Sequence, residues 1–418
     1  MSLDTQAATG ELGASARYGG WHPVTSPGIG RLGLASSLLG VAGLVCAFVV
    51  GTLLTPTAGL IVAVLVVVAV VPLVLRGRDG RSGYAAAGAR LAHRWARRRG
   101  RTRYTPALLG GRKGMGWSGP CPAPGLLARA QLRGVVVPLW GEVGVLRTRA
   151  DRWSVLLAVP VEPAALVDPN TLAAWSEGWG QWLAQLPHET QVVAATVTVE
   201  SGPDTGHTLA SESARLTHPE APNLARAFLD EVASTWPGGS LTPRVWVTLT
   251  FTTHRPGRRP ATAAQMTDLL VERVPGLCAS LARTGAGRAL PMTPDQVVAI
   301  VRGAWDPSAI ALFEAAAAAG EPHGISFADA GPVAARDEWD HLAHDDAVSC
   351  TWRMTAAPPG GVHSRVLAPL LDPHPGLLRK RVTLIYRHHQ AAEAARIADA
   401  DLRTAAVRAG ERRGQVRA

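Results

Sequence analysis

The sequence predicts a membrane α-helical hairpin followed by a cytoplasmic α+β domain with a mainly antiparallel sheet. Three observations predict it. Residues 32–75 carry no charge, and residues 76–103 are rich in Arg. In the rest of the chain, strand-like segments with a hydrophobic period of two alternate with segments of helical periodicity. The expected units are a cytoplasmic N-terminal segment (1–31), a two-span hairpin (32–75), a basic juxtamembrane segment with a Gly/Pro linker (76–130), the α+β domain (131–389) and a C-terminal helix (390–418).

The hairpin is predicted from the punctuation of the uncharged run. Thr55, Pro56 and Gly59 divide it into spans of about 32–54 and 59–75, which meet the length that a bilayer core requires. A buried helical pair in a soluble protein is less favoured, because neither span has a polar face. A cleaved signal peptide is also less favoured, because the apolar run starts well inside the chain and a second span follows at once.

The orientation is predicted from the charge that follows the second span. Ten arginines against one acid, Asp79, give residues 76–103 a charge of about +9, whereas the whole chain carries +10. Such a block marks the cytoplasmic side and binds anionic lipid headgroups, so both termini of a multi-pass plasma-membrane protein are expected in the cytoplasm. Nucleic-acid binding is less favoured, because no aromatic stacking platform accompanies the block. The expected lipid-facing residues are Arg76, Arg78, Arg81, Arg94, Arg97, Arg98, Arg99, Arg101 and Arg103, with Arg90 completing the ten.

The α+β domain is predicted from local periodicity and from helix-start signals. The expected strands are 134–140, 153–159, 191–200, 244–252, 348–354 and 381–387. The expected helices are 168–186, 224–232, 262–274, 294–302 and a charged C-terminal one from about 390. In the first of these helices Trp175, Trp179 and Trp182 share one face, which is read either as core packing or as a partner surface.

Motifs for chemistry are mostly lacking in the sequence. Neither lysine, Lys113 or Lys380, lies in a phosphate-binding loop, so no ATPase activity and no cofactor are expected. The four cysteines lie far apart, which argues against a disulfide framework or a zinc site. The richest polar cluster runs from Asp337 to Asp346. Its His341 and His344 would bind a metal if they shared a helical face, although surface ion pairs are the more usual reading of such a mixture.

Several strings of the sequence resemble an actinobacterial membrane-protein family found with integrative conjugative elements. They are residues 17–21 (RYGGW), 99–104 (RGRTRY), 300–307 (IVRGAWDP), 330–334 (AGPVA), 338–340 (EWD), 344–345 (HD) and 380–387 (KRVTLIYR). The family's architecture is similar to a PrgI-like membrane hairpin fused to the non-ATPase N-terminal part of type IV secretion/conjugation ATPases. Its members continue past position 418, so the resemblance implies that the last structural unit is missing here.

The resemblance implies a non-enzymatic subunit of a DNA-transfer machine that docks a separate motor ATPase. Two alternatives stay open: a type VII secretion membrane component, and a membrane-tethered enzyme that uses the cluster from Asp337 to Asp346. An enzyme requires those side chains to converge in a pocket, whereas a docking subunit leaves them dispersed.

Overall fold

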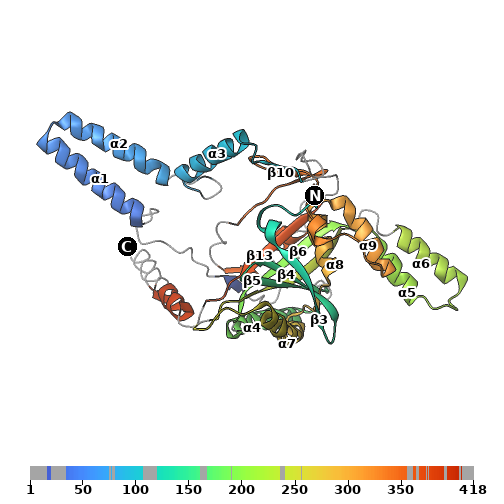
Figure 1. Ribbon diagram of the computed structural model, residues 1–418. Helices are drawn as coiled ribbons and strands as arrows, with labels where there is room; N and C mark the ends of the chain where they lie inside the picture. Colours follow the sequence, from blue (N-terminus) through green and yellow to red (C-terminus); the bar gives the residue numbers. More distant parts are fainter. Residues whose placement is uncertain are drawn as a thin grey trace, which may run out of the picture.

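The protein consists of a projecting helical hairpin, a connecting helix, a folded body and a second projecting arm (Figure 1). The computed structural model describes residues 17–19, 34–74, 77, 81–106, 120–160, 167–189, 191–235, 241–255, 257–354, 361–363, 367–372, 374, 376–389, 393–403 and 406. The hairpin and the arm extend from different sides of the body (Figure 1).

The hairpin consists of α1 (Leu34–Leu53) and α2 (Pro56–Val74), which pack against each other. The turn falls where the sequence predicts it, and the Thr55 hydroxyl accepts a hydrogen bond from the Ala58 N–H at 3.2 Å. A third helix, α3 (Gly83–Arg98), begins at the N-cap Ser82, where only a basic segment was expected. Its alanine-rich sequence favours a helix, but the dense arginines obscure that signal.

The main sheet is antiparallel throughout, so the α+β fold with a mainly antiparallel sheet is confirmed. In the described part of the chain its strands run in the order β13-β6-β7-β5-β4-β3, and β8 pairs with β5. Their bounds are β3 Gln131–Val137, β4 Gly141–Arg149, β5 Arg152–Val159, β6 Val192–Pro203, β7 Leu241–Thr252, β8 Leu290–Pro291 and β13 Lys380–Tyr386.

Helices cover both faces of this sheet. Helices α4 (Pro169–Gln185) and α7 (Ala263–Leu281) enclose the larger core, to which β5 contributes Val155 and Leu157. Helix α8 (Pro294–Trp305) covers the opposite face, where Leu156 of the same strand is buried. Successive residues of a strand point to opposite faces, so a central strand covered on both sides is apolar at nearly every position.

A smaller sheet lies at the side of the body nearer the hairpin and has the order β11-β10-β9-β2. Its strands are β2 Arg103–Tyr104, β9 Ala335–Asp337, β10 Leu342–His344 and β11 Ala347–Ser349. The remaining described elements are β1 Arg17–Gly19, β12 Gly361–His363, α10 Ala368–Leu371 and the 3-10 helices η2 Gly125–Arg129, η4 Leu186–His188, η5 Ala282–Thr284, η6 Pro307–Ala309 and η7 Phe327–Asp329.

The arm consists of α5 (His207–Leu216) and α6 (Asn223–Thr235), and it joins the body where α5 contacts α9 (Ile310–Ala319). No described residue of α6 is buried, and Leu224 and Phe228 are exposed. A cavity of about 510 Å³ lies between the two arm helices.

The predicted strand over 348–354 is largely wrong. Strand β11 ends at Ser349, and residues 350–354 form no regular structure, with Trp352 90% exposed. Apolar and polar residues alternate there, but no neighbouring strand in the described chain pairs with them. The predicted C-terminal helix is present over the described residues 393–403.

Candidate membrane interface and its connection to the domain

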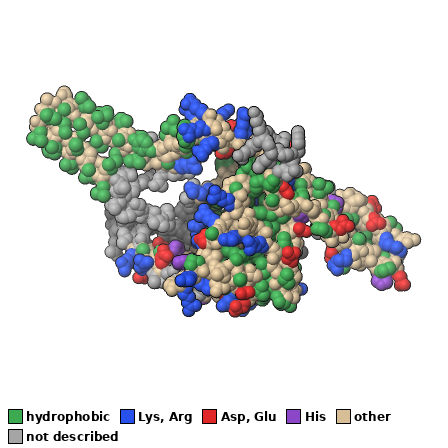
Figure 2. All heavy atoms as spheres, viewed as in Figure 1, with side chains coloured by type: hydrophobic (Ala, Val, Ile, Leu, Met, Phe, Trp, Pro, Cys, Tyr) green, Lys and Arg blue, Asp and Glu red, His purple; other side chains and the backbone are tan. Residues whose placement is uncertain are grey.

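The outward surface of the hairpin is apolar and exposed. Gly59 lies so close to Gly51 that a Cβ on Gly59 would be 2.6 Å from the Gly51 Cα, so glycines let the two helices approach closely. The larger side chains point outward, and Phe48 is 72% exposed. Figure 2 shows this continuous apolar surface, whose area is far larger than single exposed side chains provide. Its exposed members include Leu38, Leu39, Leu44, Val45, Phe48, Leu53, Leu60, Ile61, Val64, Leu65, Val67 and Val68.

One helix in the described part of the chain is long and apolar enough to cross a membrane. It is α2, whose residues Pro56–Leu73 have a mean hydropathy of 2.6. Only 6% of these residues are buried, whereas the core helix of a soluble protein is mostly buried. The other helix contributes a shorter apolar stretch, Ser37–Leu53. By length and composition, the structure therefore supports one membrane-spanning helix in the described part of the chain.

Helix α3 begins against the end of α2. The Tyr84 hydroxyl donates a hydrogen bond to the Ala69 carbonyl at 3.1 Å. A Cβ on Gly83 would lie 2.9 Å from the Pro72 carbonyl oxygen, so a residue without a side chain is needed at this contact. The hairpin and α3 are thus joined by packing as well as by the chain.

The described part of the predicted basic segment is mostly exposed on α3. Arg90, Arg94, Arg97 and Arg98 project from the helix, and arginine side chains gather there on the surface in Figure 2. The Arg99 guanidinium lies over the Trp95 ring, 3.6 Å from its centroid. Of the remaining predicted residues, Arg81 and Arg101 flank the helix, Arg103 lies in β2, and Arg76 and Arg78 lie outside the described residues.

The other side of α3 contacts the small sheet. Trp339, in the loop between β9 and β10, makes an edge contact with the His93 ring at 5.7 Å and lies under the Arg90 guanidinium at 5.8 Å. Immediately after the helix, the Asp337 N–H donates to the Thr102 carbonyl at 2.8 Å, and β2 pairs with β9. The chain that leaves the hairpin is therefore incorporated into the small sheet.

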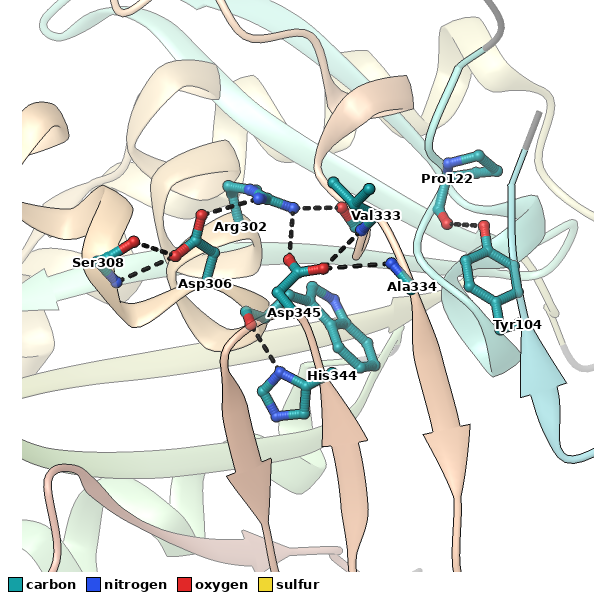
Figure 3. A network of polar contacts seen from close by, with 11 residues as sticks. Tyr104, Pro122, Arg302, Asp306, Ser308, Val333, Ala334, His344 and Asp345 are labelled. Carbon is teal, nitrogen blue, oxygen red and sulfur yellow. Dashed lines mark hydrogen bonds and ion pairs between the residues drawn. The ribbon is translucent and has the colours of Figure 1, made fainter. Parts of the chain in front are cut away.

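A buried polar network, which we call the Arg302 network, links the small sheet to α8 (Figure 3). The Arg302 guanidinium donates to the Gly331 carbonyl at 2.6 Å and to Asp306 at 2.8 Å, and it pairs with Asp345 at 3.1 Å. The other carboxylate oxygen of Asp345 accepts from the N–H groups of Val333 and Ala334, at 2.7 and 3.2 Å. Because α8 covers the main sheet, the network connects the small sheet to the core.

Two further contacts in Figure 3 strengthen the same connection. The Tyr104 hydroxyl of β2 donates to the Pro122 carbonyl. The Gly331 N–H donates to the Cys121 carbonyl at 2.8 Å, so residues predicted as linker are packed against the domain. Burial raises the pKa of Tyr104 above its ordinary value, so this hydroxyl keeps its proton at neutral pH.

The metal-binding alternative for the cluster from Asp337 to Asp346 lacks its geometric basis, because His341 and His344 do not share a helix. His344 lies in β10. Its ring forms two hydrogen bonds, one from Nδ1 to the Trp305 carbonyl and one between Nε2 and the Ser349 hydroxyl, both at 2.6 Å. His341 precedes that strand and pairs with Asp340 at 2.8 Å. No group of three or more possible metal ligands occurs among the described residues. The cluster is divided between β-sheet structure and surface ion pairs.

The three tryptophans of α4 lie on the side of that helix that faces the domain. Trp182 is only 2% exposed and donates a hydrogen bond from Nε1 to the Ser280 hydroxyl at 2.9 Å, so it is a core residue. Trp179 is half-buried, stacks on Trp182 and contacts the Tyr386 ring at 5.6 Å. Trp175 is half-buried and contacts Gly285. Its burial assigns Trp182 to the core, whereas Trp175 and Trp179 are partly accessible.

A second buried ionic cluster was not foreseen. The carboxylate of Glu200 in β6 pairs with Arg379 at 3.0 Å and with Arg381 of β13. Burial lowers the pKa of Arg379, and the Glu200 charge opposes that shift. The sequence gives no local signal for this cluster, since its members meet only when β13 joins the sheet.

The arrangement defines a class of protein in which an apolar helical hairpin and a basic helix are connected to an α+β domain. Residues 25–85 match a family model described as a domain of unknown function (DUF8461), a match that covers the hairpin and the first turn of α3. No curated protein matches the chain, and no solved structure matches it.

Proposed function

We propose that the protein is a non-enzymatic inner-membrane subunit of a conjugation/type IV secretion-like DNA-transfer machine. In this proposal the hairpin anchors a cytoplasmic domain that docks a separate motor ATPase. The observation that carries the proposal is the unpartnered apolar hairpin, connected through packed contacts to a folded domain. The choice of a conjugation system rests on the sequence strings that resemble that family.

Both helices of the hairpin cross the membrane in this proposal. Helices α1 and α2 have 20 and 19 residues. A rise of about 1.5 Å per residue makes each about 30 Å long, which matches the hydrocarbon thickness of a bilayer. The tight Gly51–Gly59 contact supports insertion as a pair, since close approach through small residues stabilises helix pairs in lipid.

The arginines of α3 set the orientation. Basic residues beside a span remain in the cytoplasm, where they contact anionic headgroups, so both termini and the whole α+β domain lie on that side. We do not propose direct nucleic-acid binding.

The docking function is supported by the arm. Helix α6 exposes Leu224 and Phe228 on a side of the body away from the hairpin, where a cytoplasmic partner has access. The tethered-enzyme alternative has less support, because the carboxylates and histidines between Asp337 and Asp346 do not converge: His344 and Asp345 are committed to internal hydrogen bonds and Asp340 pairs with His341.

The membrane proposal is tested with topology reporters. A reporter inserted near residue 57 is expected to report the outside, and one at residue 130 the cytoplasm. A cytoplasmic signal at both positions contradicts the two-span hairpin. Replacement of Arg94, Arg97 and Arg98 by Gln is expected to weaken the orientation, since each charge near an anionic leaflet contributes about 1 kcal/mol.

The machine is tested by deleting the gene from its host and measuring transfer of the DNA element to a recipient. Transfer is expected to be lost and to be restored by the intact chain, but not by a chain that lacks residues 32–75. Normal DNA transfer with loss of protein export instead identifies the type VII alternative.

A further inference from the structure

The exposed face of α3 carries a line of large apolar side chains. Tyr84, Leu91 and Trp95 are 49%, 65% and 51% exposed. Their spacing of seven and four residues places them on one side of the helix. No described residue of α3 is fully buried. We call this line the Tyr84 face.

The opposite side of α3 is the one that contacts the protein. Its half-buried residues are Ala86, Ala89, His93 and Ala96, at spacings of three, four and three. His93 contacts Trp339 of the small sheet. The Tyr84 face therefore points away from the domain, because the two sets of residues lie on opposite sides of one helix.

The surroundings of the Tyr84 face indicate what covers it. The face begins at the hairpin, since the Tyr84 hydroxyl bonds the Ala69 carbonyl near the end of the apolar stretch of α2. Along one flank lie the exposed Arg94 and Arg98, with the exposed Arg90 at the edge of that flank where its guanidinium lies over Trp339. An apolar line bordered by long cationic side chains is the pattern of a helix that lies in the membrane plane. The aromatic side chains suit the headgroup region, where Tyr and Trp are enriched.

We propose that α3 lies in the cytoplasmic membrane–water interface, with the Tyr84 face embedded and its arginine flank bound to anionic phospholipid headgroups. This inference rests on the proposed membrane hairpin, since the hairpin brings α3 to the bilayer. It adds a second lipid contact, which together with the contacts to Trp339 and β9 fixes the domain against the membrane surface.

The test is spin-label accessibility in the full chain, reconstituted into phosphatidylcholine vesicles that contain phosphatidylglycerol. Labels are placed at Leu91→Cys and, as a matched control, at Arg97→Cys, which lies about 120° around the same helix. Cys121 and Cys350 are replaced by Ser, and Cys46, exposed on α1, is kept or removed as needed. Cys278 is left in place because it is buried.

If α3 lies in the interface, the spin label at Leu91 is expected to collide more often with oxygen, which concentrates in lipid, than with a water-soluble nickel chelate. The label at Arg97 is expected to collide more often with the nickel chelate. Vesicles without phosphatidylglycerol are expected to reduce the oxygen preference at Leu91. A Leu91 label that collides freely with the nickel chelate overturns the proposal, as does one shielded from both reagents, which indicates a protein partner. A label on the native Cys46 reports separately on the hairpin. If the Cys46 label collides mainly with the nickel chelate, the proposed membrane hairpin is refuted. If the Cys46 label is exposed to lipid and the Leu91 label to water, only the inference about α3 is refuted.

Discussion

Removing the guanidinium of the Arg302 network is expected to detach the small sheet from α8. The side chains of Arg302 and Asp345 are 12% and 9% exposed, so their charges are largely shielded from water. Asp345 Oδ2 pairs with Arg302 but makes no hydrogen bond with the described atoms, so the guanidinium is its compensating charge. Asp306 is more exposed and keeps its bonds to Ser308.

The magnitude follows from this burial. Breaking a buried ion pair by removing one partner costs about 3–5 kcal/mol, because an uncompensated charge remains. We expect the loss of unfolding free energy in Arg302→Gln to lie near the lower end, about 3 kcal/mol, because Asp306, the other carboxylate that Arg302 pairs with, is partly solvated. Asp345→Asn retains an oxygen that accepts from the Val333 and Ala334 N–H groups and leaves no unpaired carboxylate, so its cost is about 1–2 kcal/mol.

The assay combines thermal unfolding of the full chain in detergent with hydrogen exchange read by peptide. Arg302→Gln is expected to accelerate exchange in β9 and β10 while β5 and β7 stay protected, since the latter belong to the main core. The double variant with Asp345→Asn is expected to be less destabilised than the sum of the single variants, because the two residues are coupled. Additive losses, or unchanged exchange in β9 and β10, refute the role assigned to the network.

Three other outcomes follow from burial. Trp182→Ala is expected to cost about 3–5 kcal/mol of unfolding free energy by chemical denaturation, and a wild-type midpoint contradicts its core placement. Burial raises the pKa of Cys278 to about 12, so its thiol is expected to resist maleimide in the native protein at neutral pH, whereas the exposed Cys350 is expected to react. Mass spectrometry of the labelled peptides tests this expectation. Glu200→Gln removes the buried carboxylate that pairs with Arg379 and Arg381 and is expected to lower the melting temperature. Glu212→Gln, at an exposed pair, is expected to leave the melting temperature unchanged, and equal melting temperatures for the two variants contradict this expectation.

Features with a local cause could be predicted from the sequence. The start of α4 follows from Asp168, whose carboxylate accepts from the Asn170 and Thr171 N–H groups at 2.9 and 3.0 Å. The start of α7 follows from the capping box of Thr262 and Gln265. Such signals lie within one helical turn, so they are visible before any tertiary contact forms.

Features that depend on distant contacts could not be predicted. Strand β2 has only two residues and exists because β9 pairs with it. A metal-binding role for the segment from Asp337 to Asp346 would require a helical face, but Asp345 has φ of 43° and turns the chain between β10 and β11. Aspartate tolerates that left-handed conformation better than most residues, which offers a weak turn signal. Helix α3 carried a usable signal in the spacing of Ala86, Ala89, His93 and Ala96.

The pairing of β2 with β9 has a consequence for the synthesis of the chain. The hairpin and β2 emerge from the ribosome early, whereas β9, the Asp345 turn and β13 are made much later. The small sheet is complete only when β11 has been translated, and the main sheet only when β13 joins it beside β6. With the hairpin inserted as proposed, a nascent chain is tethered to the bilayer while β2 and the edge of β6 wait for partners, which is a period of exposure to misassembly. Nascent chains released before β9 is translated are expected to leave β2 unpaired and to become substrates for proteolysis.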